Sequence, residues 1–398
     1  MIILDPPYVS EFLINTILEN QYPVLRNSLS ESIFSSDLVP LLDDKEALTY
    51  LLQNKPFRLY TPSEHSINWI VNHLSYTDIP DKINTYKDKV RFRQRFAPLF
   101  PSMFYREIPF SELEKLKVDR FPTPFVLKPA KGFFSMAVVR IESQQEFDHA
   151  IKKIKKEIEK LQSLYPENVL DTSHFIIEQY IPGKEFAFDA YFDSRGNPVI
   201  LNIWQHLFSS EHDVSDRVYI TSAEIVSQYR EWFQNVLNQI KKWIPLFNFP
   251  MHVEVRIDAH GQLYPIEINP FRFGGWCTTA DMSFHAYGLN LYHAYFNDIH
   301  PHWPEQIKKM KDRIYSIIVL DNSTGLDTRD IIHFNYDKLL SNFEKPVELR
   351  KIDYKTWPVF GFLFTETRAE RFFELEKILK SDLMEYVETR KEPSHKKE

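Results

Sequence analysis

The sequence predicts a chain of the α+β and α/β classes, with an N-terminal α/β unit, a strand-rich middle and a small C-terminal α+β unit. Three observations lead to this prediction. The chain has 398 residues, and a single hydrophobic core rarely grows beyond roughly 250–300 residues. Its 43% hydrophobic and 26% charged residues are typical of a globular protein. Strand-like and helix-like segments alternate over residues 1–85, whereas strands and hairpins dominate afterwards.

The first unit, residues 1–85, alternates between the two periods. Residues 2–4 form a short apolar strand, and residues 10–19 form a helix that Ser10 can cap. A second strand at 57–60 leads into a helix with apolar residues at the spacing of one helix face. This alternation predicts a parallel sheet.

The middle unit, residues 86–311, is expected to carry most of the strands. The C-terminal unit, residues 312–388, adds further strands and a long helix over residues 369–387. Residues 389–398 are highly charged and are predicted to be a disordered tail. The elements expected in the middle are strands at 125–129, 137–141, 174–181 and 185–193, helices at 145–164 and 223–243, a polar loop at 205–222 and a hairpin at 251–269.

Charge, cysteine content and hydropathy narrow the function classes. The 48 Lys and Arg against 55 Asp and Glu give a net charge of −7, which argues against a nucleic-acid partner because phosphate-backbone binding needs clustered cations. The single cysteine, Cys277, cannot form an internal disulfide. The N-terminus lacks a basic leader, and no run approaches the ~18–20 apolar residues that span a bilayer. We therefore expect a cytoplasmic protein with no membrane partner.

The segment 251–269 contains the most informative chemical pattern. Its two arms alternate as strands do, and a turn centred on His260–Gly261 places Glu254 directly opposite Glu267, with Asn269 on the same face. Like charges opposed at about 4.5–5.5 Å are destabilising, unless a hard cation lies between them. Carboxylate and amide oxygens suit Mg²⁺. A solvated acidic hairpin is the alternative.

The residues after the hairpin favour the metal site. Glycine is scarce, with 9 residues against the roughly 28 that average usage would give. Two of them, Gly274 and Gly275, follow Arg272 directly after the hairpin. This run brings a guanidinium, and backbone that can approach a ligand, next to the two carboxylates.

A second segment suits a nucleotide base and ribose. Residues 175–186 form two strands joined through Pro182–Gly183. Glu178 ends the first strand and Glu185 opens the second. An apolar slot with such acceptors at its edge fits a planar heterocycle and a sugar hydroxyl.

A third segment suits phosphates. Lys128 interrupts an apolar strand, and a buried lysine needs an anionic partner; an edge-strand lysine is the alternative. The following loop offers Gly132, Ser135 and backbone N–H groups that can close over phosphates. It matches neither a Walker A loop nor a G-x-G-x-x-G motif.

In this order, the lysine strand with its Gly/Ser loop, the E-x-x-x-x-G-x-E turn and the Glu/Glu-x-Asn hairpin resemble the ATP-grasp superfamily, of the carboxylate–amine ligase type. The resemblance spans residues 1–300. It implies an ATP-grasp fold over residues 86–311, preceded by a Rossmann-like pre-ATP-grasp domain and followed by a small α+β appendage.

The resemblance also implies residue roles. Those implied to contact ATP are Lys128 and Lys89 (with Lys87 competing for the place of Lys89), Glu178 at the adenine amino group, Tyr180 and Ile181 at the adenine edge through their backbone, and Glu185 at the ribose. Glu254, Glu267 and Asn269 would hold Mg²⁺. Two residues are implied to be catalytic: Lys128, through the phosphates of ATP, and Arg272, which would steady the acyl phosphate, although Asn-Pro-Phe-Arg is one residue longer than the frequent Asn-x-Arg.

The family chemistry implies an ADP-forming ligase. A carboxylate attacks the γ-phosphate of ATP, and an amine or a thiol then displaces phosphate from the acyl phosphate. The implied cofactors are ATP and two Mg²⁺ ions, with Mn²⁺ as a substitute; the implied partners are a small carboxylate and an amine, such as amino acids or a peptide. The oligomeric state stays open, with a homodimer as one option. Two alternatives are an ATP-grasp kinase that phosphorylates a hydroxyl and a non-catalytic ATP-binding regulatory module.

The acceptor substrate is expected near a polar segment at residues 204–217, which borders the substrate in an ATP-grasp arrangement. Arg217 can hold a substrate carboxylate bidentately, with a surface salt bridge to Asp213 or Asp216 as the alternative. His206 is a candidate proton carrier, with a structural histidine as the alternative.

Overall fold

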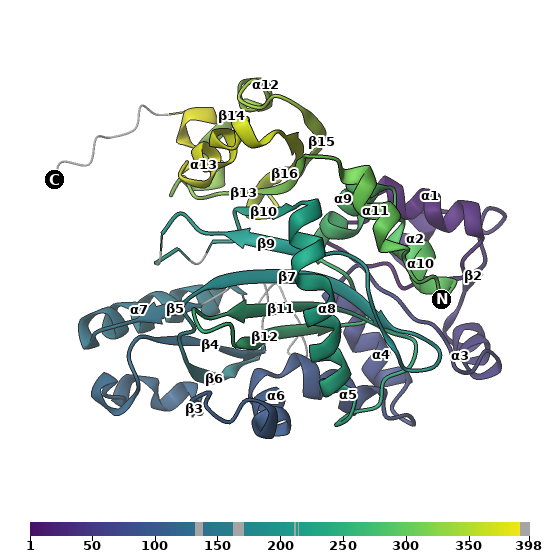
Figure 1. The fold of residues 1–398 in the computed structure, drawn as a ribbon, viewed down its shortest axis with the longest axis horizontal. Helices are drawn as coiled ribbons and strands as arrows, with labels where there is room; N and C mark the ends of the chain where they lie inside the picture. The colour runs from purple at the N-terminus through teal and green to yellow at the C-terminus, as the bar shows by residue number, and fades with distance from the viewer. Residues whose placement is uncertain (132–137, 162–170, 211, 214, 391–398) are drawn as a thin grey trace. The chain divides into compact units, whose positions relative to one another are not determined.

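The computed structural model describes residues 1–131, 138–161, 171–210, 212–213 and 215–390 (Figure 1). Its contacts divide the chain into two compact units. Unit 1 comprises residues 1–203, 229–281 and 290–301, and unit 2 comprises residues 204–228, 282–289 and 302–398. The domain boundaries expected from the sequence, at residues 85 and 311, stay a prediction.

Unit 1 begins with parallel strand pairs, as its alternating pattern predicts. Ile2 bridges in parallel to Val24 and to Tyr60. Ser10 caps the first helix, because its hydroxyl accepts a hydrogen bond from the backbone N–H of Leu13 at 3.1 Å. The elements of this region are α1 (Glu11–Asn20), β1 (Val24–Leu25), α2 (Ser28–Ile33), β2 (Leu41–Leu42), α3 (Asp44–Gln53), α4 (Ile67–His73), α5 (Ile79–Lys87) and α6 (Lys89–Phe96). Strands β1 and β2 pair in parallel.

A four-stranded antiparallel sheet follows, in the order β3-β6-β4-β5. Its strands are β3 (Tyr105–Pro109), β4 (Phe125–Lys131), β5 (Val139–Ile141) and β6 (Asp171–Gln179), and helix α7 (Gln144–Leu161) lies beside it (Figure 1). Phe125 and Leu127 of β4 share one core with Phe147 and Ile151 of α7. Because side chains alternate along a strand, Lys128 lies on the opposite face of β4.

The second sheet of unit 1 contains the carboxylate hairpin. Its strands are β7 (Lys184–Phe192), β8 (Pro198–Ile200), β11 (Phe249–Ile257) and β12 (Leu263–Pro270). Strand β11 pairs antiparallel with β12 and with β7, and β8 pairs with β7. Phe186 and Phe188 of β7 pack on Tyr229 and Phe233 of α8 (Ala223–Ile240). The other face of β7 therefore carries Glu185, Ala187 and Asp189.

Unit 2 contains a sheet of five antiparallel strands. In spatial order they are β9 (Trp204–Leu207), β10 (Val218–Thr221), β13 (Ile314–Asp321), β16 (Val359–Thr367) and β15 (Pro346–Lys351). The polar loop expected at 205–222 is wrong at both ends, since β9 and β10 occupy them. The apolar and β-branched residues of β10 pair with β13 and override the polar surroundings.

The long helix expected over residues 369–387 is also wrong. Helix α13 (Phe373–Leu379) ends early, and Leu383 takes a left-handed φ of 65° that no helix continues through. Residues Val387–Thr389 then form strand β17, which pairs with β14 (Ile331–Phe334). Thr389 is thus ordered in a ladder, and the rest of the tail, from residue 391, lies outside the described residues.

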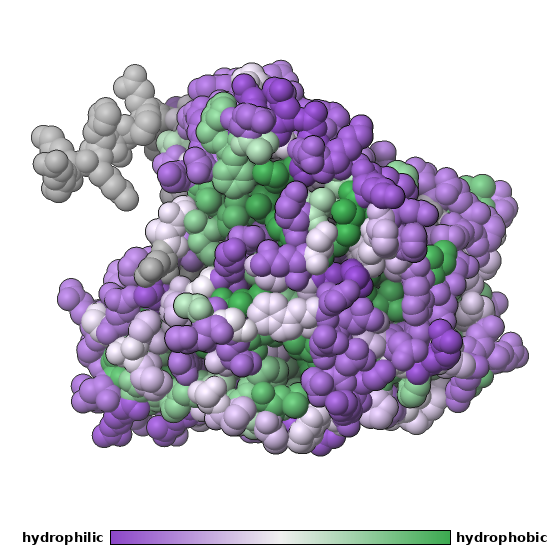
Figure 2. Space-filling model, in the orientation of Figure 1, coloured by the Kyte–Doolittle hydropathy of each residue, from purple (hydrophilic) through white to green (hydrophobic). Residues whose placement is uncertain are grey.

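The remaining helices are α9 (Thr278–Tyr287), α10 (Leu291–Phe296), α11 (Trp303–Met310) and α12 (Tyr336–Leu340). Across the described part of the chain, every helix is too short or too polar to pass through a bilayer. The face drawn in Figure 2 is largely hydrophilic, in keeping with the charged fraction of the sequence.

Candidate nucleotide and metal site

Strands β11 and β12 bring the two predicted metal carboxylates together. Glu254 and Glu267 are directly opposed partners, and His252 is opposed to Asn269, so the predicted register is confirmed. The predicted turn centre is wrong by half a residue: Asp258 N donates to Gln262 O at 3.0 Å, which centres the turn on His260. A β-bulge between this turn and the carboxylates restores the expected pairing.

The structure separates the two lysines that the sequence left in competition. Lys89 Nζ lies 3.0 Å from Glu267 Oε2, one of the two predicted metal carboxylates. Lys87 instead pairs with Glu64, a buried carboxylate that follows Ser63 at the start of a short 3-10 helix. Glu64 was not predicted as a site residue, because a Ser-Glu pair at the start of a helix is typical of helix capping.

Arg272 is buried beside the same carboxylates. Its Nε pairs with Glu64, and its Nη1 donates to Phe273 O at 2.9 Å. Burial opposes the charged form, but the carboxylates of Glu64, Glu267 and Glu254 raise the pKa of Arg272 above its usual value. The guanidinium of Arg272 therefore interacts electrostatically with both hairpin carboxylates.

The residue before Arg272 has an unusual backbone conformation that three contacts hold in place. Phe271 takes a left-handed φ of 62°, donates to Pro250 O at 2.8 Å and accepts from Thr61 N at 2.9 Å. Its buried ring packs on Phe249, with centroids 4.6 Å apart. The insertion is thus locked by packing, and the chain delivers Arg272 next to the hairpin in spite of the unusual spacing.

Asn269 is hydrogen-bonded to its neighbours in one amide orientation. In it, the amide nitrogen donates to Glu64 Oε1 and Glu267 Oε1 at 3.2 Å each, and the oxygen accepts from Arg272 Nη2 at 3.0 Å. To bind a metal ion held by the carboxylates, Asn269 would have to turn its amide oxygen, rather than its nitrogen, toward them. Binding an ion would therefore exchange the contact with Arg272 for one with the metal.

Glu178 and Lys128 form the core of the predicted base and phosphate region. Lys128 Nζ lies 2.6 Å from Glu178 Oε2, and Arg93 Nε donates to Glu178 Oε1 at 2.5 Å. Although burial alone would raise it, the charges of Arg93 and Lys128 lower the pKa of Glu178 to about 2. Burial, with the charges of Lys89 and Arg93, outweighs Glu178 and lowers the pKa of Lys128.

The prediction that a buried lysine needs an anionic partner is confirmed, and the edge-strand alternative is wrong. Lys128 is buried, and β4 lies between β6 and β5. Arg93, on α6, was missed. The signal that could have found it is its position four residues after Lys89, on the same helix face.

The predicted adenine hinge is held by Arg256. Its Nη1 donates to Ile181 O at 3.0 Å and its Nε to Glu185 Oε2 at 2.6 Å. The Tyr180 ring has guanidinium groups of Arg140 and Arg256 at 4.4 and 5.1 Å from its centroid, and Tyr180 N donates to Pro124 O. A base or ribose bound here would share these groups with their protein partners.

Asp189 is a buried carboxylate with hydrogen-bond partners in several segments. This fully buried carboxylate accepts hydrogen bonds from Asn202 Nδ2 and Thr279 Oγ1 at 2.6 Å each, Gly274 N at 2.9 Å and His252 at 2.7 Å. It thereby joins β7 to β11 and to the glycine pair after Arg272. Asp189 was not predicted, although a lone charged residue in an apolar strand is also the signal that singled out Lys128.

The predicted substrate residues lie in unit 2. Arg217 is buried, pairs with Asp321 at 2.8 Å and donates to Ser323 Oγ at 2.7 Å. The alternative of a surface salt bridge with Asp213 or Asp216 is therefore wrong.

His206 is buried too. Its Nε2 lies 2.8 Å from Ser215 O, and its ring stacks on Tyr219. This geometry fits the alternative of a structural histidine. Ser135, Gly132 and the rest of the predicted phosphate loop lie outside the described residues.

Comparison with known proteins identifies the middle of the chain. Residues 121–280 match a family model described as an ATP-grasp domain. Among curated protein sequences no match is found. Several solved structures share the fold over nearly the whole chain.

The first is an L-amino acid ligase from Bacillus licheniformis, with 18% identity, 98% of each chain covered and a TM-score of 0.62. The second is N5-carboxyaminoimidazole ribonucleotide synthetase from Thermotoga maritima, with 13% identity, 98% of this chain and 99% of the other covered, and a TM-score of 0.60. A biotin carboxylase domain dimer from Hydrogenobacter thermophilus, solved with MgADP, ADP and bicarbonate, has 11% identity, 98% and 90% coverage and a TM-score of 0.58. At these identities the likeness concerns the fold.

Proposed function

Because residues 121–280 form an ATP-grasp domain and the chain has the ATP-grasp fold, we propose that this protein is an ADP-forming ligase that joins a carboxylate to an amine or a thiol through an acyl phosphate. The observation that carries the proposal is the opposed pair Glu254 and Glu267, with Lys89 and Arg272 beside it. The kinase and the non-catalytic module are outcomes of the test below.

The donor set fits magnesium. Two opposed carboxylates and the amide of Asn269 offer hard oxygen ligands, and Mg²⁺ commonly binds one or two carboxylates together with substrate phosphates. Within the described ranges no group of three or more His, Cys, Asp or Glu side chains is placed to hold a metal. Glu254, Glu267 and Asn269 would hold the ion, which would polarise and neutralise the phosphate oxygens.

The cations of this site suit phosphoryl transfer. The carboxylate oxygen of the first substrate attacks the γ-phosphorus as the bond to ADP breaks, and the amine or thiol then attacks the acyl carbon, losing a proton while phosphate leaves. Negative charge spreads over the transferred group, and Lys89, Lys128 and Arg272 would neutralise it. Burial of Lys128 and Arg272 strengthens these interactions because water screens them less.

A substrate screen tests the proposal. Amino acids and small carboxylic acids, singly and in pairs, would be incubated with the protein and MgATP, and ADP and free phosphate would be measured together. A ligase gives both products only when both acceptors are present. A kinase gives ADP without free phosphate, and a binding module gives neither; either result would overturn the proposal.

The substitution Glu267→Gln tests the metal assignment. It removes one carboxylate charge while keeping the shape of the side chain, and it replaces the ion pair with Lys89 by at most a neutral hydrogen bond. We expect turnover to fall at least a hundredfold, since loss of a metal ligand removes the charge stabilisation on which transfer depends. Unchanged turnover would defeat the metal assignment.

A further inference from the structure

Two side chains of helix α6 contact strand β12 next to the proposed metal carboxylates. Lys89 and Arg93 lie on one face of this helix, because residues four apart are neighbours there. Lys89 Nζ lies 3.0 Å from Glu267 Oε2, and Arg93 Nη1 donates to Pro265 O at 2.7 Å. These contacts fall on either side of Ile266, which the β-bulge leaves without an opposed residue. The helix thus holds both ends of the bulge that sets the position of Glu267.

The same guanidinium reaches the predicted base site. Arg93 Nε donates to Glu178 Oε1 at 2.5 Å while Lys128 binds the other carboxylate oxygen. Both Arg93 and Glu178 are more than nine-tenths buried, so this contact is shielded from water and stronger than a surface pair. Arg93 therefore links β6, which carries Glu178, to β12, which carries Glu267.

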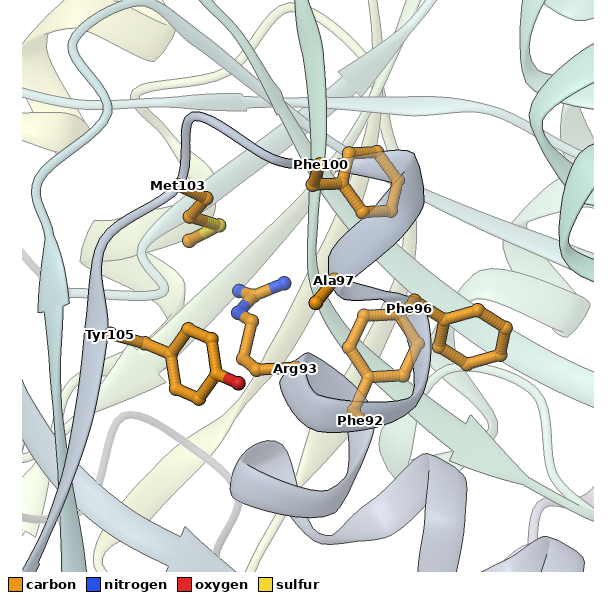
Figure 3. A pocket seen from close by; sticks show the side chains of 7 residues that line it. All are labelled: Phe92, Arg93, Phe96, Ala97, Phe100, Met103 and Tyr105. Atoms are coloured by element: carbon orange, nitrogen blue, oxygen red, sulfur yellow. The ribbon is translucent and has the colours of Figure 1, made fainter.

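The surroundings of Arg93 leave no room for a nucleotide beside its third nitrogen. Its third nitrogen, Nη2, is buried and has no hydrogen-bond partner in the described structure. The guanidinium faces a pocket lined by Phe92, Phe96, Phe100, Met103 and Tyr105 (Figure 3), which has room for about one water molecule. A nucleotide does not fit in such a pocket, and the hydrogen bonds of the other two nitrogens of Arg93 are with Glu178 and Pro265.

We propose that Arg93 is a positioning residue that couples recognition of the nucleotide base at Glu178 to placement of the metal carboxylate Glu267. The inference rests on the proposed ATP and Mg²⁺ site and adds a residue to which nothing so far gives a role. The planar guanidinium fork of Arg93 bonds a side-chain carboxylate and a backbone carbonyl of another strand through separate nitrogens in a fixed geometry, which the single ammonium nitrogen of a lysine does not reproduce. A single substitution should then disturb base selection and metal binding together.

The test uses two variants and a matched control. Arg93→Met keeps an unbranched side chain and removes both contacts. Arg93→Lys keeps one charge but not the fork. Arg91→Met changes an arginine on the same helix whose side chain is 56% exposed and near Asp88. Binding of MgATP and MgGTP would be measured by calorimetry, and Mn²⁺ binding in the presence of ADP by electron paramagnetic resonance.

For Arg93→Met we expect the preference for ATP over GTP to fall about tenfold and the Mn²⁺ dissociation constant to rise about tenfold, as for other residues that orient metal ligands. Arg93→Lys should recover base preference more than metal affinity, because the retained charge can pair with Glu178. Arg91→Met should match the wild type. A merely structural role would lower the melting temperature and leave both ratios within about twofold, which would overturn the proposal.

Two further results separate this inference from the proposed function. If the wild type binds neither nucleotide, the proposed function is wrong and the inference falls with it. If the wild type binds MgATP and Arg93→Met binds it with the same base preference and metal affinity, the inference alone is wrong. Should Arg93→Met fail to fold, Arg93→Lys decides, since equal recovery of both properties would contradict a role for the fork.

Discussion

At the scale of single residues, a charge inside an apolar strand is one of the three signals from which the site is predicted. Lys128 interrupts β4 and proves to be buried against Glu178. Asp189 interrupts β7 in the same way and is the more heavily bonded of the two. Its partners come from three other segments, so the sequence gives no hint of what it holds. A lone buried charge is thus predictable as a feature, whereas its partner is a property of the fold.

Removing the buried lysine tests its role. We expect Lys128→Ala to raise the ATP dissociation constant about tenfold or more, since a hydrogen bond to a charged group contributes roughly 1.5–3 kcal/mol. Calorimetric titration with MgATP is the measurement, and Lys115→Ala, at an exposed site, is the control. An unaltered affinity would remove Lys128 from the nucleotide site.

At the scale of elements, side-chain alternation predicted the pairing of Glu254 with Glu267, because a half-buried strand fixes its register. The bulge at Ile266 and the left-handed Phe271 were not predictable in the same way. Both depend on partners from elsewhere in the chain, namely Arg93 at Pro265 O and Thr61 at Phe271 O. Irregular backbone at the site is set by tertiary contacts, which no local pattern encodes.

The turn at Gly183 offers an element-scale prediction. Its φ is +136°, and an added Cβ would lie 2.0 Å from Ile257 O, a backbone atom that cannot give way. We expect Gly183→Ala to lower the free energy of unfolding by about 2 kcal/mol or more and to shift the hinge, so that ATP binding weakens as well. Urea unfolding and calorimetry would measure the two effects.

Gly261→Ala is the control, because it also has a positive φ, of +76°, but open space around the added carbon. It should cost only the left-handed strain, about 1 kcal/mol, and leave ATP binding unchanged. Equal losses in the two variants would show that crowding against Ile257 is not what fixes Gly183.

At the scale of the whole molecule, the class of fold and the order of the site segments were predictable, because three motifs in a fixed order carry both. The two compact units do not follow the chain in simple blocks, since unit 2 takes residues from three separate stretches. Domain boundaries predicted from sequence divide the chain into consecutive blocks. In the folded chain, each compact unit combines segments that are far apart in the sequence. The predicted substrate residues Arg217 and His206 belong to the second unit.

The buried ion pairs make the stability of the whole fold depend on acid pH. Burial alone would raise the pKa values of the Glu64 and Glu178 carboxyls. The neighbouring cations, Lys87 and Arg272 at Glu64 and Arg93 and Lys128 at Glu178, instead lower the pKa of each carboxyl from 4.5 to about 2. A depressed folded-state pKa adds stability above the unfolded value, and this is lost as the pH falls from about 5 toward 2. Each carboxyl contributes at most about 3 kcal/mol to this loss.

Urea unfolding at pH 7, 5, 4 and 3 should show the free energy of unfolding falling most steeply below pH 5. Glu178→Gln should be less stable at pH 7 and should show a shallower fall, and a fall as steep as that of the wild type would mean that Glu178 is not ionised in the native state.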